Sequence, residues 1–322
     1  MSIFFGIDVG SVSTNLVLIN EENEVIYSSY LRTQGRPIEA IKNGLIKMLS
    51  SMPQGMDIIG VGATGSGRQL ASMIVGADVV KNEITAHAVA AANQIPDVHS
   101  VLEIGGQDSK IIILDNGIVS DFAMNTVCAA GTGSFLDQQA ARLGLTIQEF
   151  AALALEAKNP VRIAGRCSVF AESDMIHKQQ LGHSTSDIVA GLCQALVRNY
   201  LNNVGKGKDI KAPVIFQGGV AANPGIKIAF AEALGLEIIV PKHYSVMGAL
   251  GAAILAREAV AQNGKSNFSG FGLIHSDFLT SSFECKGCPN LCEVIELFVD
   301  NTLKARWGDK CNKWSDIIED AI

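Results

Sequence analysis

Apolar runs of strand length, each ending in a glycine-containing turn, recur at two places in this 322-residue chain. Residues 3–26 predict a strand, a turn with Asp8 and Gly10, and two further strands. Residues 100–122 repeat this order, with a hairpin turn at Asp115-Asn116-Gly117. Two copies of one strand pattern, each followed by helices, predict a duplicated α/β domain with a cleft between its halves.

Apolar residues at helical spacing predict that the rest of the chain is mostly helical. Helices are expected over residues 133–143, 147–157, 169–181, 186–204 and 246–261, and strands over 214–216 and 237–240. After the last helix the composition changes to Asn, Ser, Gly and Phe, which indicates a linker. We therefore place the first half at residues 1–97, the second half at 98–270 and a cysteine-bearing tail at 271–322, and we expect the last helix to pack back on the first half.

Composition narrows the classes of protein that fit. Hydrophobic residues make up 48% and charged residues 18%, which are the values of a well-buried globular protein. A net charge of −7 without any block rich in Lys or Arg argues against nucleic acid as a partner. The first residues, MSIFFGIDVG, contain no basic leader segment, and no run reaches the roughly 18 to 20 apolar residues of a membrane span. We expect a cytoplasmic protein with neither membrane nor nucleic acid as a partner.

Glycine-rich turns after the predicted strands offer the chemistry of a nucleotide site. Small residues in the first turn let backbone N–H groups and hydroxyls approach a phosphate, and Asp8 can hold Mg2+ or its waters. Asp108 supplies the same chemistry in the second copy, so Asp8 and Asp108 are the candidate catalytic carboxylates for the metal and the attacking water. The candidate nucleotide-binding residues of the two turns are Gly10, Ser11, Ser13, Thr14, Gly105, Gly106 and Gln107.

Two later glycine motifs complete this set. The run VIFQGGVAAN would let a nucleoside lie against backbone at Gly218, Gly219 and Asn223, and Gly248 would let the final helix pack closely. In their order along the chain, these motifs resemble the phosphate-1, phosphate-2, adenosine and connecting motifs of the actin, Hsp70 and sugar-kinase superfamily. The resemblance implies a ribonuclease H-like ATPase fold that binds ATP or ADP with Mg2+.

Two other polar features have an ordinary structural explanation beside a functional one. The loop Thr64-Gly65-Ser66-Gly67-Arg68 is either a small-residue loop with a cation or a surface turn with a solvated Arg68. Glu83 and His87 lie one helical turn apart, and we expect a helix face whose polar groups are satisfied rather than a site.

Seven cysteines without an expected export signal indicate thiols, metal ligands or redox groups rather than structural disulfides. Cys128 and Cys167 each stand immediately before a predicted helix. A helix N-terminus carries partial positive charge and free N–H groups, so it favours a thiolate and stabilises a reduced cluster. Cys193 instead lies inside the amphipathic segment 186–204, and we expect it to be a buried core residue.

The segments around the first two cysteines, NTVCAAGTGSF and CSVFAES, resemble those of the ATP-dependent activators of 2-hydroxyacyl-CoA dehydratases, in the BadF-type ATPase family. The resemblance covers about residues 3–260 and includes GIDVGS, IGGQD, GGVA and GALGAA. It implies a homodimer in which Cys128 and Cys167 of each subunit hold one bridging 4Fe-4S cluster.

The same resemblance implies an ATPase coupled to electron transfer. Single electrons pass to an iron-sulfur acceptor, which is a 2-hydroxyacyl-CoA dehydratase or a double-cubane cluster protein. The upstream reductant is a ferredoxin or flavodoxin. ATP binding is expected to rotate one half against the other and so to move the helices that follow the two cysteines.

The tail departs from the smaller activators of the family. Cys285-x2-Cys288-x3-Cys292, with Cys311 further on, can form a closed Zn site or a second iron-sulfur cluster. A short tail with few apolar residues needs such a staple, so free surface thiols are not expected. The sequence leaves zinc and iron open.

Two other functions fit parts of the sequence. A small-molecule kinase of the same fold, acting on a sugar or a pantothenate-like alcohol, needs a general-base carboxylate, and Asp78 or Glu83 could serve. A nucleotide-gated interaction module with a zinc-binding tail is the third hypothesis. Brown protein after anaerobic purification favours the electron donor, and colourless protein from iron-replete cells favours the other two.

Overall fold

The computed structural model describes residues 2–52, 57–125 and 127–315. The chain forms two compact units, Met1–Asn82 with Ala252–Ile322, and Glu83–Gly251, which are described separately below. Thr126, in the NTVCAAGTGSF segment, and residues 316–322 of the predicted tail lie outside the described residues. The predicted boundaries at residues 97 and 270 stay a prediction.

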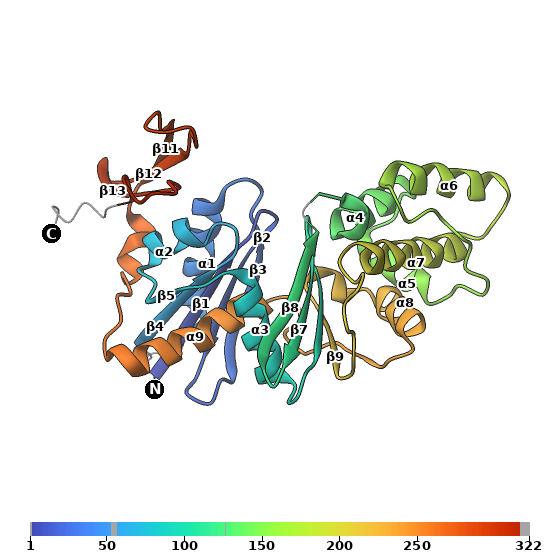
Figure 1. Ribbon diagram of the computed structural model, residues 1–322, viewed down its shortest axis with the longest axis horizontal. Coiled ribbons are helices and arrows are strands. Elements are labelled where there is room, and N and C mark those ends of the chain that lie inside the picture. The colour runs from blue at the N-terminus through green and yellow to red at the C-terminus, as the bar shows by residue number, and fades with distance from the viewer. Residues whose placement is uncertain (1, 53–56, 126, 316–322) are drawn as a thin grey trace. The chain divides into compact units, whose positions relative to one another are not determined.

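The first unit contains a five-stranded mixed sheet in the order β3-β2-β1-β4-β5 (Figure 1). The strands are β1 (Ser2–Val9), β2 (Ser13–Ile19), β3 (Val25–Arg32), β4 (Asp57–Thr64) and β5 (Val79–Val80). β1 is antiparallel to β2 and parallel to β4, so it is the central strand, and its run IFFGIDV is almost wholly buried. In the edge strand β3, half-buried and exposed residues alternate, as they do in a strand with one face exposed to solvent.

Helices cover both faces of the first sheet. Apolar residues of α1 (Pro37–Ser51) and α2 (Arg68–Val75) pack with Val61 and Ala63 of β4 in one core. The intervening Gly60 and Gly62 face α9 (Met247–Asn263) instead. Successive strand residues point to opposite faces, which explains why apolar residues and glycines alternate in this strand.

The second unit repeats the same sheet, in the order β10-β9-β6-β7-β8. Its strands are β6 (Ser100–Ile104), β7 (Ser109–Asp115), β8 (Ile118–Asn125), β9 (Val214–Gln217) and β10 (Ile238–Ile239). Its helices are α3 (Glu83–Gln94), α4 (Gly133–Arg142), α5 (Ile147–Ala154), α6 (Ser168–Gln180), α7 (Thr185–Asn203) and α8 (Pro224–Leu234). The matching strand orders confirm the duplicated α/β domain predicted from the sequence.

Polar caps and aromatic packing define the helices of the second unit. Thr146 and Glu149 form a reciprocal capping box at the start of α5. Ser184 caps α7, because its hydroxyl accepts a hydrogen bond from Asp187 N at 3.2 Å. In the core, the ring of Tyr200 lies 5.2 Å from that of Phe230, edge to face.

The tail contains a three-stranded antiparallel sheet that was not predicted, formed by β11 (Phe278–Glu284), β12 (Glu293–Val299) and β13 (Thr302–Trp307). Val294, Leu297 and Ala305 are buried in it, so this part of the chain has a small apolar core of its own. The preceding turn anchors the sheet, because Leu273 joins the core of the first unit and Lys42 Nζ donates to Ser276 O at 2.8 Å. None of the described helices is long and apolar enough to cross a membrane.

Candidate functional site

The turn after β1 carries the first group of candidate residues. Gly10 N donates to Ser13 O at 2.8 Å, and Thr33 Oγ1 donates to Gly10 O at 2.9 Å, so the turn is tightly closed. Thr14 is fully buried and its hydroxyl bonds to that of Thr33 at 3.0 Å. Thr14 therefore supports the turn, whereas Ser11 is exposed to solvent.

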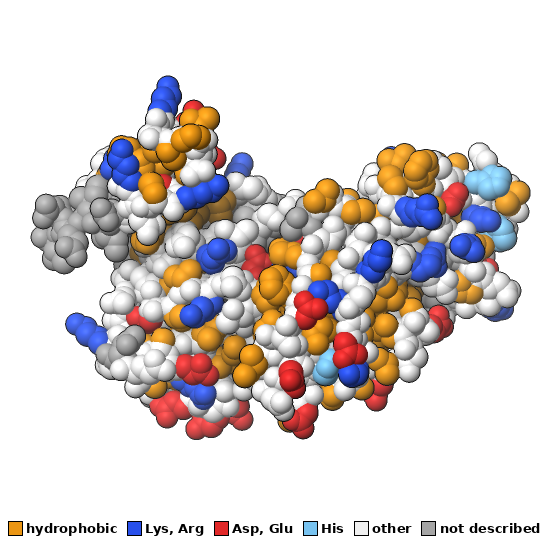
Figure 2. Space-filling model, viewed as in Figure 1, with side chains coloured by type: hydrophobic (Ala, Val, Ile, Leu, Met, Phe, Trp, Pro, Cys, Tyr) orange, Lys and Arg blue, Asp and Glu red, His pale blue; other side chains and the backbone are white. Residues whose placement is uncertain are grey.

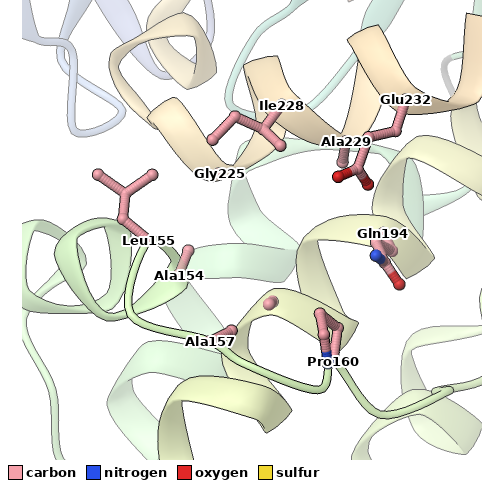
Figure 3. Close-up of a pocket in the computed structure, with 10 residues that line it drawn as sticks. Ala154, Leu155, Ala157, Pro160, Gln194, Gly225, Ile228, Ala229 and Glu232 are labelled. Carbon is pink, nitrogen blue, oxygen red and sulfur yellow. The ribbon is translucent and has the colours of Figure 1, made fainter. Parts of the chain in front are cut away.

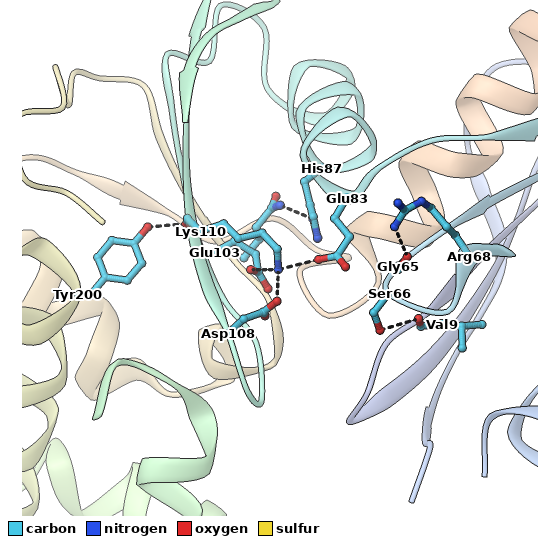
Figure 4. A network of polar contacts seen from close by, with 11 residues as sticks. Val9, Gly65, Ser66, Arg68, Glu83, His87, Glu103, Asp108, Lys110 and Tyr200 are labelled. Atoms are coloured by element: carbon cyan, nitrogen blue, oxygen red, sulfur yellow. Dashed lines mark hydrogen bonds and ion pairs between the residues drawn. The ribbon is translucent and has the colours of Figure 1, made fainter. Parts of the chain in front are cut away.

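A second loop of the first unit, between β4 and α2, packs directly on this turn. Gly65 has φ +94°, and a Cβ at this position would lie 2.5 Å from Asp8 Oδ1. Any side chain here would therefore clash with the Asp8 carboxylate, so the position requires glycine. Gly67 N donates to Val9 O at 2.8 Å. Arg68 Nη1 donates to Gly65 O at 3.1 Å and closes its own loop (Figure 4). The loop from Thr64 to Arg68 is thus built beside Asp8, and it is more than a surface turn.

In the second unit, the turn between β6 and β7 carries Gly105, Gly106, Gln107 and Asp108. Gly105 N donates to Asp108 O at 3.0 Å, which closes the turn. Its carbonyls bind the first turn of α4, because Gly133 N donates to Gly105 O at 2.8 Å and Ser134 N donates to Gly106 O at 2.9 Å. α4 follows directly on the Cys128 segment, so the candidate phosphate loop and a candidate cysteine ligand share one short structural unit.

Lys110, on β7, forms a buried ion cluster beside this turn (Figure 4). Its Nζ lies 2.9 Å from Glu83, 3.1 Å from Glu103 and 3.0 Å from Asp108. Burial alone lowers the pKa of Lys110, but the three carboxylates outweigh it and hold that pKa above its ordinary value. Burial raises the pKa of Glu103 to about 7, against the opposing effect of Lys110.

His87 lies next to this cluster on α3. Burial lowers its pKa to about 3, and the nearby Lys110 acts in the same direction, so the imidazole is neutral. The amide nitrogen of Gln217 lies 2.8 Å from His87 Nδ1, which therefore accepts and leaves the proton on Nε2. The polar groups of Glu83 and His87 have partners, as expected, but His87 is buried and Glu83 is half-buried beside the ion cluster.

Of the later glycine motifs, Gly218, Gly219 and Asn223 follow β9, whereas Gly248 lies on α9. Gly218 has φ +89° and its N–H donates to Tyr244 O at 2.8 Å. Asn223 caps α8, with its side chain accepting from Gly225 N at 2.9 Å. Gly219 begins a short 3-10 turn, and Gly248 is buried in the first turn of α9. Their roles in binding a nucleoside stay predictions.

Cys128 and Cys167 both precede a helix, as predicted. Cys128 stands before the 3-10 turn Ala129–Gly131, and Cys167 is the N-cap of α6. Both thiols are half-buried. Asn125 fixes the first segment, because its side-chain oxygen accepts from Cys128 N at 3.0 Å and its nitrogen donates to Cys128 O at 2.9 Å.

Asn199, on α7, joins the two cysteine segments. Its Nδ2 donates to Gly165 O at 2.5 Å and lies 3.8 Å from Cys128 Sγ. Gly165 is two residues before Cys167, so one buried amide holds both segments. This role could not be predicted from the sequence, because Asn199 is a polar residue within an apolar helical pattern.

The surface next to the two cysteines is hydrophobic. Val127 is 95% exposed, Val169 65% and Phe170 64%. Figure 2 shows hydrophobic side chains gathered over α6. Exposed apolar groups of this size are typical of an interaction surface.

Cys193 differs from Cys128 and Cys167, since it is buried in the core, as expected, and burial raises the pKa of its thiol to about 12.

The tail cysteines lie at one end of the small sheet. Cys285 N donates to Cys292 O at 2.8 Å, and Trp314 Nε1 donates to Cys285 Sγ at 3.2 Å. Hydrogen bonds from Gly287 N and then Trp314 lower the pKa of the Cys285 thiol. Cys288 and Cys311 are exposed. No three His, Cys, Asp or Glu side chains of the described residues are arranged to hold a metal ion, and the tail metal stays a prediction.

The residues suggested for a kinase base have other partners. Asp78 accepts hydrogen bonds from Val61 N at 2.7 Å, Asn267 N at 2.6 Å and the Ser266 hydroxyl at 2.7 Å, so it is a structural residue. Glu83 is paired with Lys110. Neither is placed as a general base.

A cavity of about 160 Å³ lies between α5, α7 and α8 (Figure 3). It is lined mainly by apolar groups such as Leu155, Pro160 and Ile228, with Glu232 as its carboxylate. Pockets for drug-sized ligands measure about 300–1,000 Å³. This cavity is therefore small for a kinase substrate, and none of the glycine turns after the strands contributes to it.

Comparison with known proteins gives a consistent result. Residues 5–256 match the model of the BadF/BadG/BcrA/BcrD ATPase family. The (R)-2-hydroxyglutaryl-CoA dehydratase activating ATPase of Acidaminococcus fermentans is 37% identical over 273 residues, which cover 81% of this chain and 100% of that protein. The activator of the 2-hydroxyisocaproyl-CoA dehydratase from Clostridium difficile, solved with bound ADPNP, superposes with a TM-score of 0.71 at 32% identity, covering 83% of this chain and 100% of that one.

The fold extends to sugar kinases. The xylulose kinase of Lactobacillus acidophilus matches with a TM-score of 0.51 at 10% identity, covering 85% of this chain and 91% of that one. This likeness concerns the fold alone. The actin, Hsp70 and sugar-kinase fold predicted from the motifs is confirmed. The family match ends at residue 256, before the strands of the tail.

Proposed function

The chain belongs to the BadF/BadG/BcrA/BcrD ATPase family, and from this premise we propose that it is an ATP-hydrolysing electron donor that works as a homodimer. As a member of this family it is an ATPase. Its proposed acceptor is a 2-hydroxyacyl-CoA dehydratase, because the relative from Acidaminococcus fermentans is by name an activating ATPase of such an enzyme. A ferredoxin or flavodoxin is the proposed reductant.

The proposed nucleotide chemistry rests on the two glycine turns. Asp8 lies near the end of the central strand β1, Asp108 lies in the turn after the central strand β6, and both turns are closed by backbone hydrogen bonds. We assign Mg2+ and the attacking water to these two carboxylates. Gly10 N and Gly105 N donate within their own turns and hold them closed. The other backbone N–H groups and hydroxyls of these turns suit phosphate oxygens, because small residues leave room for the approach.

The residues around Cys128 and Cys167 fit a 4Fe-4S cluster shared by two chains. Each thiol precedes a helix, where the partial positive charge favours a thiolate. The Asn199 amide beside Cys128 can donate to sulfur, which tunes the potential of such centres. Two thiols are half the ligands that a four-thiolate cluster needs, and the apolar surface at Val169 and Phe170 suits a second copy of the chain. A cluster bound there would supply one-electron transfer.

One observation carries the proposed coupling between ATP and electron transfer. The carbonyls of Gly105 and Gly106 accept from the first N–H groups of α4, at Gly133 and Ser134. α4 is separated from Cys128 by only one short 3-10 turn. A displacement of the phosphate loop is therefore transmitted to the cysteine segment through hydrogen bonds rather than through a flexible linker.

The test compares Cys128→Ser and Cys167→Ser with Cys288→Ser, a variant of an exposed tail thiol. Anaerobic iron and sulfide analysis is combined with sedimentation and ATP binding. Wild-type protein should carry about four bridging irons per dimer, plus any in the tail, and the Cys288→Ser control should keep the four bridging irons. The two other variants should lose these irons and weaken the dimer, yet still bind ATP. A Cys128→Ser protein that keeps its iron, its dimer and its reduction of the dehydratase would refute the proposal.

A further inference from the structure

We propose that Lys110 is a positioning residue that connects Asp108, in the turn between β6 and β7, to Glu83, where the chain enters the second unit. This inference rests on the proposed function, because Asp108 must face the nucleotide. Lys110 holds Asp108 with one N–H and Glu83 with another. It thereby passes a change at the nucleotide to the helix that begins the unit.

The geometry of the cluster supports this role. Glu83, Glu103 and Asp108 come from α3, β6 and the β6–β7 turn, and all three lie within 3.1 Å of one Nζ. The side chain of Lys110 is 3% exposed. An ammonium has three N–H donors, so each carboxylate can take one of them. The backbone below is also fixed, because Tyr200 Oη donates to Lys110 O at 2.6 Å.

The three arms of the cluster differ in exposure. The side chain of Glu103 is 5% exposed and is held in the core, whereas that of Asp108 is 29% exposed and can meet a ligand. A metal-bound nucleotide that attracts the Asp108 carboxylate competes with Lys110 for it. The ammonium then depends more strongly on Glu83 and Glu103, since a buried charge needs partners.

Glu83 lies at one of the two points where the chain passes between the units. It is the first residue of α3 and of the second unit, and the chain crosses between the units at residues 82–83 and 251–252. Gly251, at the other crossing, packs on α3, because a Cβ there would lie 2.6 Å from the carbonyl carbon of Ala86. Both crossings are therefore attached to α3, whose first residue is held by Lys110.

The experiment measures how the full-length protein responds to ADPNP with Mg2+. Hydrogen–deuterium exchange of α3 and α9 is recorded with and without nucleotide in wild type, in Glu83→Gln and in Asp121→Asn. The Asp121 variant is the matched control, since it removes another lysine–carboxylate pair of the same unit, that of Lys208 at 2.7 Å. Glu83→Gln keeps the shape of the side chain and removes the charge.

In wild type and Asp121→Asn, nucleotide should slow exchange in α3. In Glu83→Gln that response should be lost, while the KM for ATP stays within about threefold and kcat falls, because the loop still binds but no longer moves the helix. Lys110→Met should also lose the slowing of exchange in α3. If Lys110→Met does not fold, Glu83→Gln alone decides the test. A Glu83→Gln protein with the wild-type exchange response and kcat overturns the inference. Hydrogen–deuterium exchange can be measured in protein without iron. The electron-donor proposal is tested by the iron content of the cysteine variants, so its failure is distinguishable from failure of this inference.

Discussion

Replacing Gly62 by alanine tests how α9 is seated on the first sheet. Gly60 and Gly62 lie on one face of β4, opposite Ala252 and Ala256 of α9. A Cβ at Gly62 would lie 2.7 Å from the carbonyl carbon of Ala252 and closer still to its oxygen. Ordinary contacts begin near 3.4 Å, so the helix or the strand has to shift.

The size of the effect follows from what the new methyl group meets. Overpacking a core costs about 1–3 kcal/mol, and occasionally more when the neighbour cannot move. Both atoms met by the methyl group at Gly62 belong to the backbone, so we expect about 3 kcal/mol. At Gly60 the nearest atoms are side-chain carbons at 3.0 Å, so Gly60→Ala should cost less, about 1 kcal/mol.

The assay is thermal unfolding of the purified protein, with Gly272→Ala as the matched control in the same unit. A Cβ at Gly272 meets nothing within 4 Å, so this change should be neutral or stabilise by about 0.4–1 kcal/mol through the unfolded chain. Gly62→Ala should lower the Tm of the first unit by about 6–12 °C. A Gly62→Ala protein that melts within about 2 °C of wild type would show that α9 does not rest on β4.

Four further outcomes are expected. The pKa of His87 is about 3 in the folded state against an ordinary 6.5, so its contribution to stability is present above pH 6.5 and is lost as the pH falls towards 3. Between pH 7 and pH 4, the free energy of unfolding in urea should therefore fall by about 3 kcal/mol more in wild type than in His87→Asn. Asn199→Ala should cost about 1–3 kcal/mol by the same measurement, because Gly165 O loses its buried partner. Asp8→Ala and Asp108→Ala should keep their iron but hydrolyse Mg-ATP at least about a hundredfold more slowly, and normal turnover in both would contradict their assignment. Truncation after Asp277 should keep the dimer and the bridging iron, whereas a folded truncation without iron would move the cluster to the tail.

The repeated sheet was predictable because its signals are local. Buried strands followed by Asp-containing glycine turns occur at 3–26 and 100–122, and the two strand orders match. One helix start was also readable, since Cys167 stands immediately before α6, as predicted. Motif order then indicated the fold superfamily, and the segments around Cys128 and Cys167 indicated the family.

Long-range polar contacts were not predictable in the same way. Glu83 is paired with Lys110 of β7, which lies 27 positions further along the chain, so helical spacing alone gave no reason to expect this ion pair. Asn199 is a polar residue in a mostly apolar helical pattern, and its role depends on the carbonyl of Gly165, which is 34 positions away in the sequence and accepts its hydrogen bond. The tail strands were missed because most residues of β11 are exposed, which removes the alternation that identifies a strand.

The attachment of the tail has a consequence for electron traffic within one subunit. The tail sheet is fastened to the first unit through Leu273 and Lys42, whereas Cys128 and Cys167 belong to the second. If ATP rotates one unit against the other, as proposed, the distance that an electron must cross between the tail thiols and the cysteine pair changes with the nucleotide state. A redox metal in the tail would then exchange electrons with the proposed cluster in one nucleotide state more readily than in the other.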